Sequence, residues 1–542
     1  MRQPHCVGAG PDDVSAGRVT TSGSRGVPRW SPPLRRAGLA LLGLLLFVAA
    51  APSWAGAASW PSAGQNFANS HSNFLEVGLG TQAARHLQVK WTYTTHGDVS
   101  ATPAVVDGAV YFPDWGGYLN KVNALTGAPI WSLKLADLVG SPTKVVSRAG
   151  PAVDNGTVYL GTQGGARLLA INAATGALKW SRQLDSHPLA ILTQSPLVFD
   201  GVVYQGVASL EENAAANPTY PCCSFQGSMQ AVNAKTGVVL WKTLMLPDNH
   251  GQLGGFTGAG VWGSHAALDP LTNTVYITTG NNYSVPADVK QCELNGGTNC
   301  SPPANRIDAV VALNAKTGAV RWTYYASPGF DDWNVACFFL GPNCPVNPGP
   351  DYDFGSGPQL MVAKVGNHLQ TLIGAGQKSG AYYALDAGTG QLVWANSAGP
   401  GSTLGGIEWG TSYDGRRIYI AQANFNGGPY QMANGQTVTS GSFAALDPAT
   451  GHTLWQIADP SGGVDLADLS SANGVLYAGS MTGHMYAIDG ATGEVLFDYL
   501  GDGSSIAGPA IVNGVLYWGN GYSNLPLPGF TPSTKFYAFA AP

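Results

Sequence analysis

Two adjacent cysteines, Cys222 and Cys223, form the most conspicuous chemical feature of the chain. Outside residues 1–57 the six cysteines fall into three close pairs: Cys222 with Cys223, Cys292 with Cys300, and Cys337 with Cys344. An even number of cysteines in an exported chain indicates disulfides, and local pairing is the simplest connectivity. A disulfide between neighbours adds little loop-closure stabilisation, so it suits a rigid wall beside a site. The alternative is that these two cysteines bridge elsewhere or stay reduced.

Glu211 and Asn281 bear a carboxylate and an amide oxygen, which suit a hard cation in general, but the sequence by itself does not pair them. Glu211 follows the predicted strand VVYQGVAS, and Asn281 closes the segment YITTGN. The two residues lie far apart in the sequence, so their spacing alone does not define a metal site. Glu212 is an alternative to Glu211, and without further information either glutamate is equally well explained as a solvated loop acid.

A repeated phrase predicts the elements that position these side chains. Seven copies join an apolar strand to a second strand through a Thr-Gly turn: NALTGAPIW, NAATGALKW, NAKTGVVLW, NAKTGAVRW, DAGTGQLVW, DPATGHTLW and DGATGEVLF. The glycine permits the positive φ of a hairpin turn, and Asn or Asp bonds the turn backbone. Another strand pair precedes most copies, as in TPAVVDGAVYF. Four strands per unit predict the blades of a β-propeller.

The two ends of the chain complete the blade count. The C-terminal segments GPAIVNGVLYWGN and KFYAFA supply strands without the repeated phrase, and LQVKWTYTT near the other end supplies one strand without a partner. We therefore expect an all-β, eight-bladed β-propeller, closed by pairing of the N- and C-terminal strands, as a single domain over residues 58–542. Seven blades with an extra hairpin is the main alternative.

Composition and charge agree with an exported all-β protein. The 73 glycines and 15 tryptophans fit a turn-rich β fold. A twin arginine, an apolar run over residues 37–51 and small residues after it predict a signal peptide over residues 1–57, cleaved near Ala57. Without that segment the chain has 20 basic and 30 acidic residues, which argues against nucleic acid or an anionic membrane as partner. We expect a periplasmic or extracellular protein without a stable membrane anchor, and an uncleaved anchor is the alternative.

The repeat and the segments between its copies resemble the quinoprotein alcohol dehydrogenases, most of all the polyvinyl alcohol dehydrogenase branch. The matching segments are GVASLEENAAANPTYPCCSFQGS, TTGNNYS, DDWNVAC and GAGQKSGAYYALD. The resemblance covers essentially the whole chain after the signal peptide. It implies pyrroloquinoline quinone (PQQ) and a calcium ion on the propeller axis, with Glu211 and Asn281 as metal ligands.

The resemblance also implies which side chains bind PQQ. Arg148 and Thr193 match positions that bind the carboxylates of the cofactor, and guanidinium and hydroxyl donors suit that role. Lys378 matches the basic residue beside the quinone oxygens. Trp262 matches the tryptophan that stacks on the flat ring, with the Cys222–Cys223 ring as a candidate for the opposite face. In the family the paired cysteines lie in an earlier blade, so the match is incomplete there.

The proton acceptor departs from the family pattern. The family places an aspartate directly after the tryptophan of a D-x-W-D segment, but this chain reads Asp331-Asp332-Trp333-Asn334. An amide cannot accept the proton of the alcohol, so the resemblance implies Asp332, or else Asp331, as the base. It also implies hydride transfer from a secondary or polymeric alcohol to PQQ. Because the chain has no Cys-x-x-Cys-His motif for haem, electrons would pass to an external carrier such as a cytochrome c.

Two other functions fit the predicted fold. A cofactor-free propeller that binds an envelope or extracellular component shares the same repeat. A secreted carbohydrate-binding propeller would use rim aromatics such as those in FNGGPYQM and GYSNLPLPGF. The enzyme hypothesis is favoured because five matching residues fall in successive blades: Arg148, Thr193, Glu211, Asn281 and Lys378.

Overall fold

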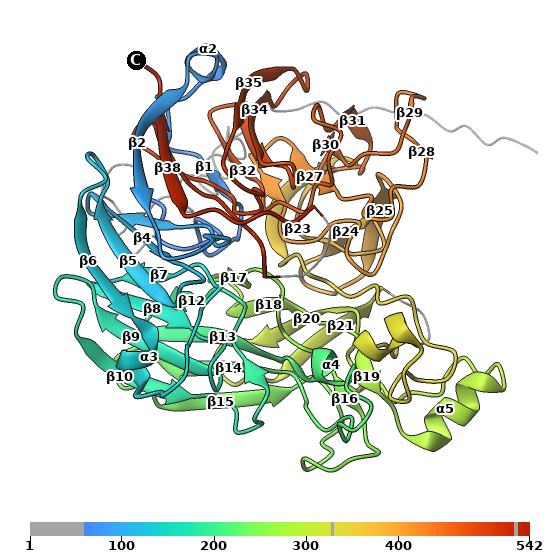
Figure 1. The fold of residues 1–542 in the computed structure, drawn as a ribbon. Coiled ribbons are helices and arrows are strands. Elements are labelled where there is room, and N and C mark those ends of the chain that lie inside the picture. The colour runs from blue at the N-terminus through green and yellow to red at the C-terminus, as the bar shows by residue number, and fades with distance from the viewer. Residues whose placement is uncertain (1–58, 327–329, 525–528) are drawn as a thin grey trace, which may run out of the picture. The chain divides into compact units, whose positions relative to one another are not determined.

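A computed structural model describes residues 59–326, 330–524 and 529–542. These residues form eight blades, each built on four antiparallel strands, that follow one another in chain order around a ring (Figure 1). The prediction of an all-β, eight-bladed propeller is therefore confirmed. The predicted signal peptide, residues 1–57, lies outside the described residues.

Each blade contains four strands, ordered from the inside of the ring outward. The first four blades are β3–β6 (Ala104–Val106, Ala109–Pro113, Tyr118–Asn123, Pro129–Lys134), β7–β10 (Ala152–Asp154, Thr157–Gly161, Arg167–Asn172, Leu178–Gln183), β12–β15 (Leu197–Phe199, Val202–Ser209, Ser228–Asn233, Val239–Leu244) and β17, β18, β20 and β21 (Ala267–Asp269, Thr274–Thr278, Ala309–Asn314, Val320–Tyr325). The next three are β22–β25 (Gln359–Val365, His368–Gly376, Ala381–Asp386, Leu392–Ser397), β26, β27, β30 and β31 (Ser412–Tyr413, Ile418–Gln422, Ser442–Leu446, Thr453–Ala458) and β32–β35 (Ser470–Ala472, Val475–Gly479, His484–Asp489, Val495–Leu500).

Short elements lie between and beside these strands. The strands among them are β1 (Ser72–Asn73), β11 (Ala190–Ile191), β16 (Thr257–Gly258), β19 (Asn282–Ser284), β28 (Tyr430–Gln431) and β29 (Thr437–Val438). The helices are α2 (Thr81–Ala84), α3 (Leu135–Val139), α4 (Glu211–Ala214), α5 (Ala287–Leu294) and the 3₁₀ helix η1 (Val335–Phe339). No helix in the described part of the chain is long and apolar enough to cross a membrane.

The eighth blade joins the two ends of the chain. It consists of β36 (Ala510–Val512), β37 (Val515–Gly519), β38 (Lys535–Ala540) and β2 (Gln88–Thr94). The N-terminal β2 pairs antiparallel with the C-terminal β38, with Trp91 opposite Ala538 (Figure 1). The ring is thus closed by the predicted pairing of the two ends, and the seven-blade alternative is wrong.

In six of the seven copies the tryptophan of the repeated phrase joins its blade to the next. The indole of Trp180 donates a hydrogen bond of 3.0 Å to the carbonyl of Ala234, in the turn of the following blade. Trp91 does the same with Ala124 at 3.1 Å, which closes the ring. The turn glycine is required because a Cβ on Gly127, whose φ is +71°, would lie 2.7 Å from the Trp91 ring. The repeat therefore encodes the contacts between blades as well as the hairpins.

Strand direction determines which loops meet at the site. Because successive strands of a blade are antiparallel, the loop from its second to its third strand and the loop that leads to the next blade lie on the same face of the ring. The Thr-Gly turns lie on the opposite face. We call the first of these the loop face. It carries every residue that the sequence predicts to bind metal, cofactor or proton.

An inner segment, residues 60–73, bonds to the innermost strands around the ring. It meets the blades in chain order through backbone hydrogen bonds: Trp60 with Val105, Pro61 with Val153, Phe67 with Leu268, Ala68 with Leu360, Ser70 with Tyr413, and His71 with Ser471. The side chain of Asn69 adds a bond of 2.9 Å to the carbonyl of Pro358. Innermost strands would otherwise expose unpaired backbone groups. The inner segment therefore ties the blades together from within.

Candidate active site

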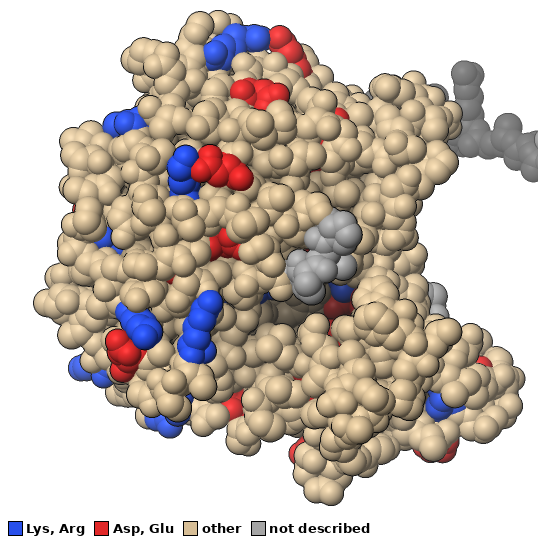
Figure 2. Space-filling model, in the orientation of Figure 1, with Lys and Arg blue, Asp and Glu red and all other residues tan. Residues whose placement is uncertain are grey.

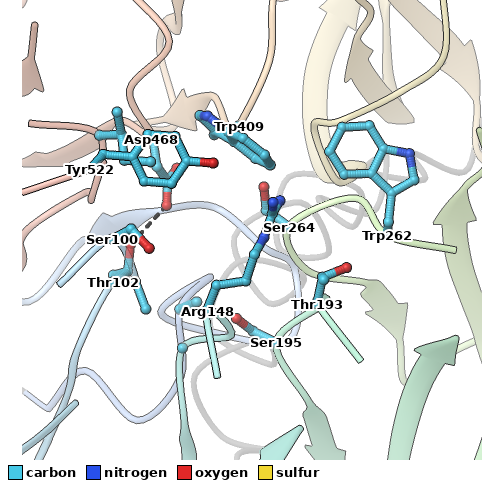
Figure 3. A pocket seen from close by; sticks show the side chains of 14 residues that line it. Ser100, Thr102, Arg148, Thr193, Ser195, Trp262, Ser264, Trp409, Asp468 and Tyr522 are labelled. Carbon is cyan, nitrogen blue, oxygen red and sulfur yellow. Dashed lines mark hydrogen bonds between the residues drawn. The ribbon is translucent and has the colours of Figure 1, made fainter. Parts of the chain in front are cut away.

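A pocket on the loop face brings together side chains from several blades. Its walls include Arg148, Thr193, Ser195, Trp262, Trp409 and Tyr522 (Figure 3). Charged side chains are sparse on the face shown in Figure 2, but acidic and basic atoms lie together within its central hollow. Arg148, Thr193 and Trp262 are far apart in the sequence, and the ring places all three in one pocket.

Arg148 lies in this pocket without a counter-ion among the described residues. Its guanidinium carbon is 4.1 Å from the ring centre of Trp409 and 5.9 Å from that of Trp262 (Figure 3). Burial lowers the pKa of Arg148, and the nearby Tyr522 and Glu408 only partly offset this. Among the described arginines, ion pairs are formed by Arg85 and Arg417. The pocket thus offers a cation, held against the Trp409 ring, to an anionic ligand.

Thr193 offers a second donor to the pocket. The side chain is 8% exposed, and its Oγ1 has no hydrogen-bond partner within the described residues. Buried hydroxyl groups are normally satisfied. It lies beside Arg148, on the side toward Trp262 (Figure 3), where it can donate to a ligand in the same pocket.

Trp262 and Lys378 are linked through one carboxylate. The indole of Trp262 donates to Asp353 Oδ2 at 2.7 Å, and Lys378 Nζ lies 2.6 Å from Asp353 Oδ1. Lys378 also pairs with Asp351 at 3.2 Å and lies 5.2 Å from the Trp262 ring centre. Burial lowers the pKa of Lys378, but these two carboxylates outweigh it and hold that pKa well above its usual value. Lys378 is therefore charged and fixed beside the Trp262 ring.

Buried acids gather around Lys378 and outnumber it. We call them the carboxyl cluster: Glu212, Asp308, Asp331, Asp351, Asp353 and Glu408. Burial and mutual repulsion raise the pKa of Glu212 to about 8, of Glu408 to about 7 and of Asp331 to about 6. Lys378 opposes this rise for Glu212 and Glu408 without cancelling it. Such an excess of buried negative charge calls for protons or a cation.

The two glutamates of α4 face different environments. Glu211 is fully buried and accepts hydrogen bonds from the backbone amides of Phe225 at 2.8 Å and Ser224 at 2.9 Å. His187 Nε2 is 3.4 Å away. Burial raises the pKa of Glu211, but these partners outweigh it, so the pKa is lowered and the carboxylate stays charged. Glu212 belongs to the carboxyl cluster instead, and burial is the largest cause of its raised pKa.

Asp331 and Asp332 also point to different partners. Asp332 Oδ1 forms an ion pair of 2.9 Å with Lys290 of α5. Asp331 accepts from the backbone amides of Asp351 at 2.9 Å and Tyr352 at 2.7 Å, and it belongs to the carboxyl cluster. Of the two aspartates, Asp331 is thus the one whose charge interacts with the groups around Lys378.

Asn334 takes a structural role at the position where the family has aspartate. Its Oδ1 accepts from the amide of Ala336 at 3.1 Å, which caps η1. Its Nδ2 donates to the carbonyl of Asn343 at 2.8 Å. Asn281 is buried nearby, and its Nδ2 donates to the carbonyl of Trp333 at 2.9 Å. This bond orients the amide of Asn281 and engages its nitrogen rather than its oxygen.

The cysteines pair locally in the structure: Cys222 with Cys223, Cys292 with Cys300, and Cys337 with Cys344. The Cys222–Cys223 disulfide packs in a core cluster with Phe225 and Tyr283. It lies next in sequence to the amides that bind Glu211, and neither cysteine lines the pocket around Arg148. The residues that follow it in the chain thus bind Glu211, and the stacking of the Cys222–Cys223 ring on a cofactor stays a prediction.

Within the described ranges, no group of three His, Cys, Asp or Glu side chains is arranged to hold a metal ion. A cation at the carboxyl cluster would therefore need oxygen atoms from another source, such as a bound cofactor.

Comparison with known proteins shows what this chain is similar to. The family model described as outer membrane protein assembly factor BamB matches residues 87–245 and 439–523. A polyvinylalcohol dehydrogenase from a Pseudomonas species is 29% identical over 477 residues, which cover 82% of this chain and 70% of that protein. A second polyvinylalcohol dehydrogenase, from Sphingopyxis sp. strain 113P3, is 28% identical over a match that covers 81% of this chain and 68% of that protein.

This chain is similar to the polyvinylalcohol dehydrogenases. The solved structure of a quinohemoprotein alcohol dehydrogenase from Pseudomonas putida HK5 has the same fold, with a TM-score of 0.70 and 21% identity over 89% of this chain and 80% of that one. The resemblance inferred from the repeat and its intervening segments is thus confirmed.

The sequence did not predict several residues that the structure places at the site. Trp409, Asp308 and Asp353 belong to the site but lie outside the repeated phrase and the segments that match the family. Trp409 and Asp353 lie in loops that lead into the next blade, as Arg148 and Trp262 do. Their position in such a loop is the one sequence feature that could have indicated them. It does not distinguish these side chains from other loop residues.

Proposed function

We propose that the chain is a PQQ- and calcium-dependent alcohol dehydrogenase. The observation that carries the proposal is the pocket itself, where the unpaired guanidinium of Arg148 and the unpaired hydroxyl of Thr193 face the same space as Trp262 within the described residues. A flat tricarboxylate matches that combination of a cation, a hydroxyl donor and an aromatic surface. The relatives named as polyvinylalcohol dehydrogenases support the same reaction class.

The residues of the pocket suit PQQ in distinct ways. Arg148 and Thr193 would bind its carboxylates, Trp262 would lie against its ring, and Lys378 would donate to its quinone oxygens. The Asp353 carboxylate fixes both Trp262 and Lys378, so their positions are set before the cofactor binds. When bound, PQQ supplies the carbonyl carbon that accepts hydride from the alcohol, and calcium polarises that carbonyl.

Calcium fits the charge of the site. The carboxyl cluster holds more acids than Lys378 can balance, and their raised pKa values express that imbalance. Asn281 and an acid of α4 would contribute protein oxygens, with Glu212 better placed than Glu211. The oxygens of Glu211 already accept bonds from Ser224 and Phe225.

Asp331 is our candidate for the group that takes the proton of the alcohol. Its pKa, raised to about 6, leaves it ionised at neutral pH and able to accept a proton. Asp332 is paired with Lys290, which opposes the rise that burial gives to the pKa of Asp332 and occupies its carboxylate. Two backbone amides orient the Asp331 carboxylate, so it needs no rearrangement to act.

The substrate class, the electron acceptor and export complete the proposal. A secondary or polymeric alcohol is oxidised, and an external carrier such as a cytochrome c takes the electrons. The protein works outside the cytoplasm after removal of residues 1–57. A cofactor-free binding scaffold is the second candidate, supported by the BamB family match, but it gives no reason for an unpaired Arg148 in a pocket.

Dye-linked alcohol oxidation tests the proposed function. The purified chain, with PQQ and calcium added, is supplied with an artificial electron acceptor and a panel of primary, secondary and oligomeric alcohols. Turnover that requires both additions supports the proposal. Binding of PQQ without turnover on any alcohol would retain the cofactor site and reject the reaction, and no response to PQQ would favour the scaffold.

A further inference from the structure

Two aspartates outside the pocket around Arg148 are buried where the sixth and seventh blades meet. Asp459 and Asp465 lie in the loop from β31 to β32 and are 4% and 0% exposed. Among the described residues, no Lys, Arg or His side chain forms an ion pair with either of them. A buried carboxyl group needs hydrogen-bond donors, a proton or a cation. The surroundings of each aspartate show which of these it has.

Asp459 has a full set of hydrogen-bond donors. Its Oδ1 accepts from the backbone amide and the hydroxyl of Ser461, both at 2.7 Å, and from the hydroxyl of Tyr486 at 2.9 Å. Its Oδ2 accepts from the hydroxyl of Ser480, which lies just after β33 in the seventh blade. Burial raises the pKa of Asp459, but its hydrogen bonds outweigh this and leave the pKa lowered. Asp459 is therefore a fixed, charged carboxylate.

Asp465 has the opposite surroundings. Neither of its carboxyl oxygens has a hydrogen-bond partner within the described residues. Burial and the adjacent charge of Asp459 raise the pKa of Asp465 well above its usual value. A proton on Asp465 would let one oxygen donate to Asp459 but would leave the other oxygen without a donor, and buried polar atoms are normally paired. A cation would contact both oxygens at once.

Two glycines keep space open beside these carboxyl groups. A Cβ on Gly441 would lie 2.6 Å from Asp465 Oδ2 and 2.8 Å from the carbonyl oxygen of Gln422. A Cβ on Gly463 would lie 2.5 Å from the hydroxyl oxygen of Ser480. Any larger residue would therefore crowd the oxygen atoms that gather here. We call these oxygen-bearing groups the oxygen cluster: Asp459, Asp465, Ser480 and the backbone carbonyl of Gln422.

We propose that the oxygen cluster binds a calcium ion that joins the sixth and seventh blades. Calcium binds carboxylate, carbonyl and water oxygens in a flexible arrangement, and its double charge balances two carboxylates. Both oxygens of Asp465, Oδ2 of Asp459 and the carbonyl of Gln422 would contact the ion, with water completing the ligand set. Gln422 belongs to β27 of the sixth blade, whereas Ser480 belongs to the seventh. This site is separate from the calcium proposed beside PQQ and does not depend on the proposed function.

Calcium titration of the chain without PQQ tests the proposal. The purified chain is freed of metal with a chelator and titrated with calcium by calorimetry. We expect one saturable site with a Kd of about 10⁻⁴–10⁻³ M, the range of calcium sites in extracellular modules. The Tm should rise by about 1–2 °C at calcium concentrations about ten times the Kd.

Asp465→Asn separates a cation from a proton at this position. The asparagine keeps the shape of the side chain, and its amide can donate to Asp459 as a protonated Asp465 would. We expect the calcium Kd to rise at least about tenfold, while the Tm without calcium stays at the wild-type value or rises. Asp269→Asn is the matched control, because Asp269 is 7% exposed and accepts bonds from Leu271 and Thr272 in another blade. This control should bind calcium as wild type does.

Three results would overturn the proposal. Absence of saturable calcium binding up to about ten times the expected Kd would mean that Asp465 holds only a proton. Equal calcium Kd values in wild type and Asp465→Asn would place the ion elsewhere. Binding that is lost in Glu212→Gln but kept in Asp465→Asn would assign the ion to the carboxyl cluster. Because these measurements need neither PQQ nor an alcohol, failure of the dehydrogenase assay would leave their outcome unchanged.

Discussion

Replacing Arg148 with methionine should separate cofactor binding from fold stability. The guanidinium stacks 4.1 Å from the Trp409 ring centre and forms no ion pair with a described carboxylate. Methionine keeps the length and much of the apolar contact but removes the charge. The variant therefore removes a positive charge. Burial makes that charge unfavourable in the protein without cofactor, and a bound carboxylate would pair with it.

The expected magnitudes follow from those contacts. Removing one partner of a buried, hydrogen-bonded charge pair costs about 2–5 kcal/mol of binding free energy, so PQQ affinity should fall by a factor of about 30 or more. The free energy of unfolding of the chain without cofactor should change by less than about 1 kcal/mol, or rise, because no ion pair is broken. A residue that served only the fold would show the opposite pattern.

The assay combines two measurements on the same protein. Fluorescence quenching by PQQ gives the affinity, and urea unfolding without PQQ gives the stability. Arg167→Met is the control, since Arg167 lies on β9 and donates to Ser181 at 3.4 Å. An Arg148→Met protein that binds PQQ as well as wild type, or that loses more than about 2 kcal/mol of stability, would refute the assignment of Arg148 to the cofactor.

Three further outcomes are expected. Asp331→Asn should lower kcat, measured by dye reduction, at least about 100-fold. Asp332→Asn should retain more activity, because Asp332 pairs with Lys290. Similar losses of kcat in the two variants would contradict the choice of Asp331 as the base. Because the pKa values of Glu212 and Glu408 are raised to about 8 and about 7, the folded chain without metal binds more protons than the unfolded chain above about pH 4.5, so its Tm should fall as pH rises from 6 to 8. Added PQQ and calcium should reduce that fall in Tm. A Tm that rises from pH 6 to 8 would contradict the claim that the buried acids outnumber the cations that balance them. Asn69→Ala should cost about 1–3 kcal/mol in urea unfolding, because the carbonyl of Pro358 loses its donor, and a neutral result would argue against the inner segment as a tie between blades.

The repeated phrase contains enough information to predict the propeller. A Thr-Gly turn and an aromatic residue at fixed spacing define the hairpin, and the indole bond from Trp180 to Ala234 shows why the same spacing also joins blades. Closure by β2 and β38 could be predicted because each end supplied strands that lacked partners. The inner segment was not predictable, because it bonds mainly through its backbone and follows no pattern in the sequence.

The choice between adjacent residues needed the structure. Glu211 and Glu212 occupy one short helix, and the amides of Ser224 and Phe225 decide which of them is tied to the protein. Asp331 and Asp332 are likewise separated by the position of α5, whose Lys290 captures one of them. Such choices depend on segments distant in the sequence, so spacing alone cannot make them.

Equilibrium binding of PQQ is the most direct test of the central claim. The purified chain is titrated with PQQ, with and without calcium, while the quinone absorbance is followed. Our account predicts saturable binding of one PQQ per chain that is strengthened by calcium and weakened in Arg148→Met. Absence of saturable binding under both conditions would contradict it and leave the propeller as a binding scaffold.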